Sequence, residues 1–119
     1  MAAGKLSTHV LDTAHGRPAA GVRIELYRVG APGGAAPLVE AVTNADGRTA
    51  QALLEGEDFC AGTYRLAFHV GDYFAAQGHA DAKRFLDVVP VVFTADDPAA
   101  GYHVPLLVSP WAYSTYRGS

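Results

Sequence analysis

The chain has 119 residues, a formal net charge of −3 and one cysteine, and half of its residues are hydrophobic. This length fits one domain, residues 1–119, which can bury roughly two-thirds of its unfolded surface without a disulfide or metal staple. The composition is too apolar for a disordered chain, and a single cysteine excludes an intrachain disulfide scaffold. The sequence has no cluster of basic residues that would indicate binding to nucleic acid or to an anionic membrane.

Hydrophobic and polar residues alternate along segments 6–11, 22–27 and 63–70. A period of two is typical of strands with one buried face. We expect the following side chains to face the core: Leu6, Thr8, Val10, Val22, Ile24, Leu26, Tyr64, Leu66, Phe68 and Val70.

Residues typical of turns separate the strands. His-Gly-Arg-Pro at 15–18 ends the first strand, and residues 30–37 form a loop rich in Gly, Ala and Pro. Asn-Ala-Asp-Gly at 44–47 predicts a hairpin, and Ala-Asp-Asp-Pro at 95–98 predicts a further turn.

One stretch suits a helix. Asp72 could cap it, residues 73–77 would form it, and Gly78 would stop it. The helix is therefore expected to be short and to stand alone among strands.

Segments 86–94 and 102–109 are apolar on both faces, and 112–116 forms a short last strand. Such strands are covered twice, by the core and by a partner subunit. Pro90 and Pro105 cannot donate to a ladder, so each should lie at an edge-facing position or a bulge. Strands at this spacing, without helical crossovers, predict an all-β fold, a two-sheet antiparallel sandwich of about seven to eight strands with one short helix.

The five histidines are the residues best suited to acid/base chemistry, because imidazole titrates near neutral pH. His9 and His103 lie mid-strand, where a polar ring needs a partner or a solvent-lined surface. His15 and His79 adjoin turns and are expected on the surface, and His69 is expected to have a cross-strand partner. There is no His-Glu-x-x-His or Cys-x-x-Cys metal template and no Gly-x-Ser-x-Gly elbow, so a structural and a catalytic role both remain open for these histidines.

Cys60 could be a catalytic thiol, but beside Phe59 and Ala61 it is expected to be a small buried hydrophobic residue. No apolar stretch approaches the ~20 residues of a membrane helix, and the first residues lack the apolar region of a signal peptide. We therefore expect a cytoplasmic protein without a membrane partner.

Three segments carry a resemblance to a known family: Leu-Ser-Thr-His-Val-Leu-Asp-Thr-Ala-His-Gly-Arg-Pro-Ala at 6–19, Thr-Asn-Ala-Asp-Gly-Arg-Thr at 43–49, and Tyr-His-Val-Pro-Leu-Leu-Val-Ser-Pro-Trp-Ala-Tyr-Ser-Thr-Tyr-Arg-Gly-Ser at 102–119. In this order they resemble the transthyretin-like 5-hydroxyisourate hydrolases. Residues 85–93 also resemble a strand of that family, so the resemblance covers essentially the whole chain.

The resemblance implies an active site with two sets of residues. The catalytic set is His9, Arg48 and His103, in which the histidines hold and deprotonate water and the arginine stabilises the substrate oxyanion. No metal or organic cofactor is implied. The substrate-binding set is Tyr116, Arg117, Gly118 and Ser119.

The resemblance also implies an activity and an assembly. The reaction would be hydrolysis of 5-hydroxyisourate to 2-oxo-4-hydroxy-4-carboxy-5-ureidoimidazoline in urate breakdown, in a homotetramer with active sites in an intersubunit channel. One alternative is a transthyretin-like protein that binds a hormone or another small ligand without enzymatic activity. Its channel should be mostly apolar, whereas the residues expected to face the channel here are polar. Another alternative is a monomeric sandwich that serves as an interaction module.

Overall fold

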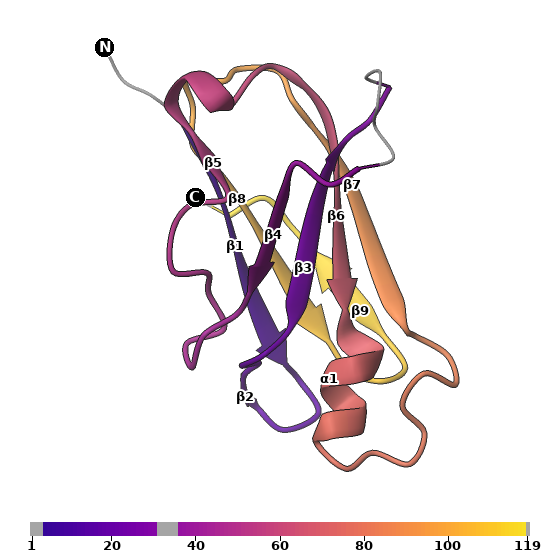
Figure 1. Cartoon of the computed structure of the whole chain (residues 1–119). Coiled ribbons are helices and arrows are strands. Elements are labelled where there is room, and N and C mark those ends of the chain that lie inside the picture. The colour runs from indigo at the N-terminus through magenta and orange to yellow at the C-terminus, as the bar shows by residue number, and fades with distance from the viewer. Residues whose placement is uncertain (1–3, 31–35, 119) are drawn as a thin grey trace.

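The computed structural model describes residues 4–30 and 36–118, whose strands form two sheets packed face to face (Figure 1). The elements in chain order are β1 (Lys5–Asp12), β2 (Arg17–Pro18), β3 (Arg23–Arg28), β4 (Val39–Val42), β5 (Leu54–Glu55), the 3₁₀ helix η1 (Gly56–Asp58), β6 (Gly62–His69), α1 (Val70–Ala76), β7 (Val88–Ala95), β8 (Tyr102–Val108) and β9 (Tyr113–Thr115).

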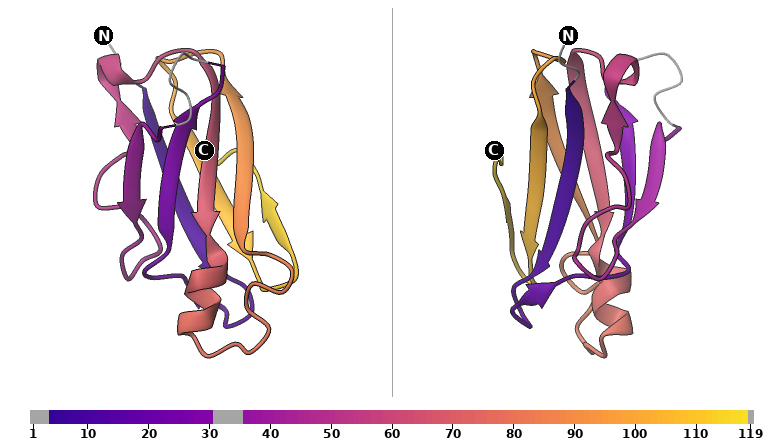
Figure 2. Two further views of the ribbon diagram at one scale, coloured as in Figure 1. Left: turned by 45° about the vertical axis from the view of Figure 1, so that its right-hand side comes forward. Right: turned by 90° about the vertical axis from the view of Figure 1, so that its left-hand side faces the viewer.

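The expected two-sheet sandwich is confirmed. One sheet has the order β2-β1-β8-β9, with β5 also paired to β1, and the other has the order β4-β3-β6-β7. Figure 2 shows the two sheets as separate layers, with α1 at one end of the sandwich. The described residues form nine strands instead of seven or eight, because the two-residue strands β2 and β5 are too short to show a period.

One strand pair departs from the antiparallel expectation. β1 and β8 run parallel, from the pair Leu6 and Tyr102 to the pair Asp12 and Val108. Every other strand pair in the described ranges is antiparallel. Hydrophobic alternation does not report strand direction, and no hairpin ties these two strands, which lie far apart in the chain.

The core lies between the sheets and is filled by the residues that the period of two predicts. Val10, Leu26 and Leu66 are fully buried, and burial of a side chain of this size contributes about 1.5–3 kcal/mol. Thr8 is also buried, and its hydroxyl donates a hydrogen bond to the carbonyl oxygen of Val104 at 2.7 Å. The residues between these inward positions therefore face away from the core.

The helix α1 begins earlier than expected and ends at Ala76, one residue before the expected last residue. Its cap is His69 and its first residue is Val70, so Asp72 lies in the first turn and not at the cap. A carboxylate is favourable there because the start of a helix carries partial positive charge. Gly78 follows the helix with φ of +88°, a conformation that favours glycine.

The two late prolines lie where the loss of an N–H group is tolerated. Pro90 is in β7, an edge strand of its sheet. Pro105 is in the interior strand β8, and its carbonyl accepts a hydrogen bond from the Thr115 hydroxyl at 2.7 Å. Its polar backbone atoms therefore face β9, whose pairing stops at Leu106, the next residue.

Two expectations for single segments are wrong. Cys60 is exposed because its neighbour Phe59, only 2% exposed, takes the position in the core. The turn at 44–47 does not close a hairpin: β4 before it belongs to one sheet, and Arg48 after it pairs with the other.

Most of the loop expected at 30–37 lies outside the described residues. Within the described ranges, no helix is long and apolar enough to span a membrane.

Candidate active site

His9 and His103 lie on the outer face of the five-stranded sheet. They belong to the parallel neighbours β1 and β8, where Ser7 is opposite His103 and His9 is opposite Pro105. Because side chains alternate along a strand, Ser7 and His9 share the face that points away from the core. The two imidazole rings lie with their centroids 6.4 Å apart.

Two single β-bridges widen this face on both sides. Arg48 pairs with His9, and Gly118 pairs with His103. The backbone of Arg48, β1, β8 and the segment after β9 therefore lie side by side. The order across the sheet is Arg48, His9, His103 and Gly118, although 109 positions separate His9 from Gly118 in the sequence.

The turn at 44–47 places Arg48 against β1. The Asn44 side-chain oxygen accepts hydrogen bonds from the amides of Asp46 and Arg48, at 2.9 and 3.2 Å. Gly47 has φ of +75°, and a Cβ at this position would lie 2.4 Å from the carbonyl oxygen of Val10. Only glycine fits this close approach, in which the amide of Val10 donates to the Gly47 carbonyl at 2.8 Å.

Each site histidine has a different hydrogen-bond partner. His9 Nε2 lies 2.9 Å from the backbone carbonyl oxygen of Asp46, and since a carbonyl only accepts, this nitrogen carries the proton. His103 Nδ1 lies 2.8 Å from Ser7 Oγ, which can donate or accept. Burial, with the charges of Arg48 and His9 added, lowers the pKa of His103, so this ring is neutral near pH 7.

Gly118 lies at the end of this order across the sheet, directly beside His103. Its amide donates to the His103 carbonyl oxygen at 2.7 Å, and a Cβ at position 118 would lie 2.6 Å from His103 Cδ2. Any side chain here would therefore collide with the ring. Ser119, the last of the expected substrate-binding residues, lies outside the described residues.

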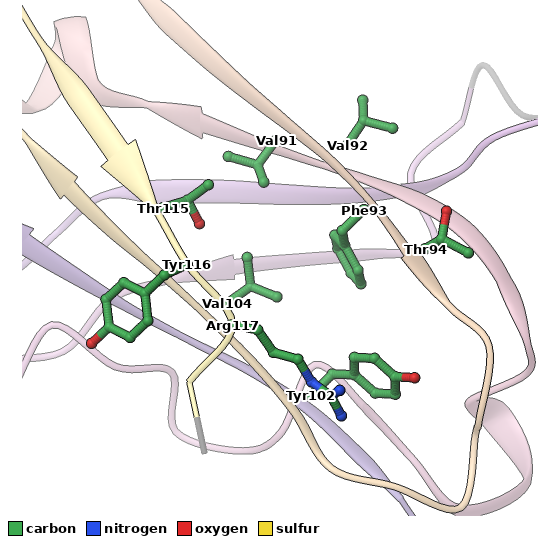
Figure 3. A pocket seen from close by; sticks show the side chains of 9 residues that line it. All are labelled: Val91, Val92, Phe93, Thr94, Tyr102, Val104, Thr115, Tyr116 and Arg117. Carbon is green, nitrogen blue, oxygen red and sulfur yellow. The ribbon is translucent and has the colours of Figure 1, made fainter.

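Tyr116 and Arg117 lie beside a separate cavity. The Arg117 guanidinium lies over the Tyr102 ring, 4.2 Å from its centroid (Figure 3). Tyr116 is 59% exposed. The cavity has a volume of about 230 Å³, and its lining does not include the two site histidines or Arg48. It lies between β7, β8 and the chain after β9, lined by Val91, Val92, Phe93, Thr94, Tyr102, Val104, Thr115, Tyr116 and Arg117.

Residues 6–118 match the model of the HIUase/Transthyretin family. The chain belongs to this family. One relative is the 5-hydroxyisourate hydrolase of Deinococcus radiodurans, 55% identical over 114 residues that cover 96% of this chain and 95% of that protein. The resemblance seen in the sequence is thereby confirmed.

Two solved structures are similar to this chain over nearly its whole length. An (S)-allantoin synthase structure matches with a TM-score of 0.92 and 48% identity, covering 99% of this chain, which spans 44% of that one. Sea bream transthyretin in complex with thyroxine matches with a TM-score of 0.84 and 30% identity, covering 96% of this chain and 94% of that one. The transthyretin-like sandwich expected from the sequence is therefore confirmed.

The other three histidines lie away from the row formed by Arg48, His9 and His103. His69 is bonded to Glu25 on the neighbouring strand at 2.6 Å, which confirms its cross-strand partner. His15 is exposed, and His79 is half-buried with its Nε2 atom 3.2 Å from that of His15. Within residues 4–30 and 36–118, no group of three or more His, Cys, Asp or Glu side chains is arranged to hold a metal ion.

The sequence reasoning missed two partners of the site histidines, Ser7 and the Asp46 carbonyl. Ser7 could have been found, since it precedes His9 by two residues and a period of two places both on one face. The Asp46 carbonyl could not, because a backbone group 37 residues from His9 leaves no signature in the sequence.

Proposed function

We propose that this chain hydrolyses 5-hydroxyisourate to 2-oxo-4-hydroxy-4-carboxy-5-ureidoimidazoline, a step of urate breakdown. The observation that carries the proposal is the row of Arg48, His9 and His103 on one sheet face. The chain is also 55% identical to a protein named 5-hydroxyisourate hydrolase.

The reaction is the hydrolysis of a cyclic amide. The oxygen of a water molecule adds to a ring carbonyl carbon, the bond from that carbon to the ring nitrogen breaks, and a proton from water ends on the leaving nitrogen. This sequence needs a base for the water, a stabilised oxyanion and an acid for the nitrogen. His9 and His103 hold the water between them, and the lowered pKa of His103 keeps that ring ready to accept its proton.

Arg48 supplies the fixed positive charge. Its guanidinium carries a positive charge and offers planar donors to the substrate carbonyls and the developing oxyanion. The bridge to His9 holds its backbone beside the reacting face. The substrate-binding role of Tyr116, Arg117, Gly118 and Ser119 stays a prediction, for which the contact of Gly118 with His103 is the structural support.

A homotetramer with its active sites in an intersubunit channel would cover the site. His9 and His103 are only half-buried in one chain. Large hydrophobic side chains elsewhere are exposed, including Phe85 at 68% and Val92 at 60%. Patches of this kind mark interfaces between proteins. The cytoplasmic location and the single domain over residues 1–119 stay predictions.

The alternative is a ligand carrier like sea bream transthyretin, whose structure holds thyroxine. A carrier pocket should be mainly apolar, whereas the face here presents two imidazoles and a guanidinium. One experiment with two arms tests both functions: the ultraviolet decay of freshly generated 5-hydroxyisourate with and without protein, and titration of the protein with thyroxine. We expect faster decay and no saturable hormone binding. Unchanged decay with tight thyroxine binding would reverse the assignment.

A further inference from the structure

A serine lies directly against one of the two site histidines. We propose that Ser7 is a positioning residue whose hydroxyl holds the His103 ring in every protonation state, so that His103 Nε2 takes the proton from water and returns it to the leaving nitrogen. This proposal rests on the proposed function and assigns within it a division of labour between the histidines.

The contact is built into the backbone register. Ser7 is directly opposite His103 in the β1–β8 pair, and its Oγ lies 2.8 Å from His103 Nδ1. The two neighbours of Ser7 in β1, Leu6 and Thr8, are fully or almost fully buried. The serine therefore stands on an anchored strand, and its short side chain has little conformational freedom to lose.

A hydroxyl serves each form of the ring. When His103 Nε2 is unprotonated, Nδ1–H donates to Ser7 Oγ. After Nε2 has accepted a proton, the charged ring still donates from Nδ1. If the proton rests on Nε2 alone, the serine hydroxyl turns and donates to Nδ1. Ser7 gains and loses no proton in the cycle, and the ring need not rotate.

His9 has no such freedom. Its Nε2 faces the Asp46 carbonyl oxygen, which can accept but never donate. A neutral His9 is therefore held as the tautomer with the proton on Nε2, because the other tautomer would set a lone pair against the carbonyl. The two partners thus separate an orienting histidine, His9, from a proton-carrying one, His103.

The test compares Ser7→Ala with Ser7→Thr, which keeps the hydroxyl. Thr63→Val is the matched control, because it removes another strand hydroxyl, 3.1 Å from that of Thr94 in the other sheet. We expect Ser7→Ala to lower kcat about tenfold with KM changed less than about twofold, as for a group that acts in the transition state. Ser7→Thr should recover most of kcat, and Thr63→Val should leave it unchanged.

Nitrogen-15 NMR of the histidine rings gives a readout that needs no substrate. Ser7→Ala should shift the His103 ring nitrogens and change their tautomer balance, while the His9 resonances stay in place. Unchanged His103 resonances in Ser7→Ala, or no recovery in Ser7→Thr, would overturn the proposal. Should Ser7→Ala not fold, Ser7→Cys keeps the same branching of the side chain and replaces the hydroxyl by a weak donor, with the same expected shift. A native chain that fails to hydrolyse 5-hydroxyisourate would refute the function instead, whatever the resonances show.

Discussion

Single residues set the charge balance of the site. Burial, with the positive charge of Arg48 added, lowers the pKa of His103. One fixed cation beside a neutral imidazole is a suitable arrangement for an oxyanion that forms close to a base. A protonated His103 would make this arrangement much less effective, because the charged ring could no longer accept a proton from water.

Substitutions of His103 and Arg48 test these roles. His103→Asn removes the proton carrier and Arg48→Ala removes the fixed charge, so each should lower the rate of 5-hydroxyisourate hydrolysis by about 10²-fold or more. The measurement is the steady-state rate of each purified variant, with circular dichroism as the check on folding. If both folded variants kept near-native rates, the active site would have to be sought elsewhere on the chain.

Only part of the site can be predicted from residue patterns. His9 and His103 stand out because polar rings interrupt apolar strands, and their shared face follows once the strands pair. Arg48 has no pattern of its own, and only the family resemblance indicates it. Its place beside His9 depends on the steric fit of Gly47 against Val10, which is a tertiary contact.

At the scale of elements, Asp12 ties β1 to α1. The carboxylate is almost fully buried and accepts hydrogen bonds from the amide of His15 at 3.0 Å, from the His15 ring and from the Tyr73 hydroxyl at 2.7 Å. Burial opposes its ionisation, but the bonds from His15 and Tyr73 outweigh burial and lower the pKa of Asp12. Burial and then Asp12 raise the pKa of Tyr73 to about 12, so its hydroxyl remains a donor.

Asp12→Asn should therefore destabilise the fold in a pH-dependent way. A carboxyl with a lowered folded pKa adds stability above its unfolded pKa of about 3.9, and this stability is lost as pH falls through the folded pKa. We expect a loss of about 1–3 kcal/mol at pH 7, the range for a buried hydrogen-bonding group left with a poor partner. Urea unfolding should show a smaller difference from the native chain near pH 3.

Asp58→Asn is the control for this pH dependence. It makes the same change of charge at an exposed position in η1. A stability difference at Asp12 that did not depend on pH, or one of equal size at Asp58, would show that the ionised Asp12 carboxylate does not hold β1 to α1.

Elements were predicted well wherever one strand carries its own signal. The inward residues of β1, β3 and β6 follow from the period of two, and Gly78 marks the end of α1. The sequence does not predict strand direction, the very short strands or the exposure of Cys60. These features depend on pairing and packing between distant segments. The turn at 44–47 shows the limit, since its sequence predicts a reversal but not which sheet the chain enters next.

At the scale of the whole molecule, the main feature is an apolar surface that one chain leaves exposed. Val88 and Val92 on the outer face of β7 are 44% and 60% exposed, and Phe85 packs beside Trp111 with both rings largely in solvent. The sequence predicts that β7 is covered on both faces, which a single chain does not provide. Association of identical chains would bury this surface.

Sedimentation equilibrium tests the assembly. We expect the native chain at micromolar concentration to sediment as a tetramer of about 50 kDa, four times the 12.5 kDa chain. Val92→Lys should favour smaller species, because a charge would be buried in the interface. Ala99→Lys adds the same charge at an exposed turn and should remain tetrameric. A native monomer would contradict the channel arrangement.

The most direct measurement for the whole molecule is carbon-13 NMR of labelled 5-hydroxyisourate mixed with the native chain. It follows substrate loss and product identity in one sample, beside a sample without protein. We predict that the ring carbonyl signal is replaced by the carboxylate signal of 2-oxo-4-hydroxy-4-carboxy-5-ureidoimidazoline while the protein-free sample still holds substrate. Decay at the same rate in both samples, or a product without that carboxylate, would contradict the proposed hydrolysis.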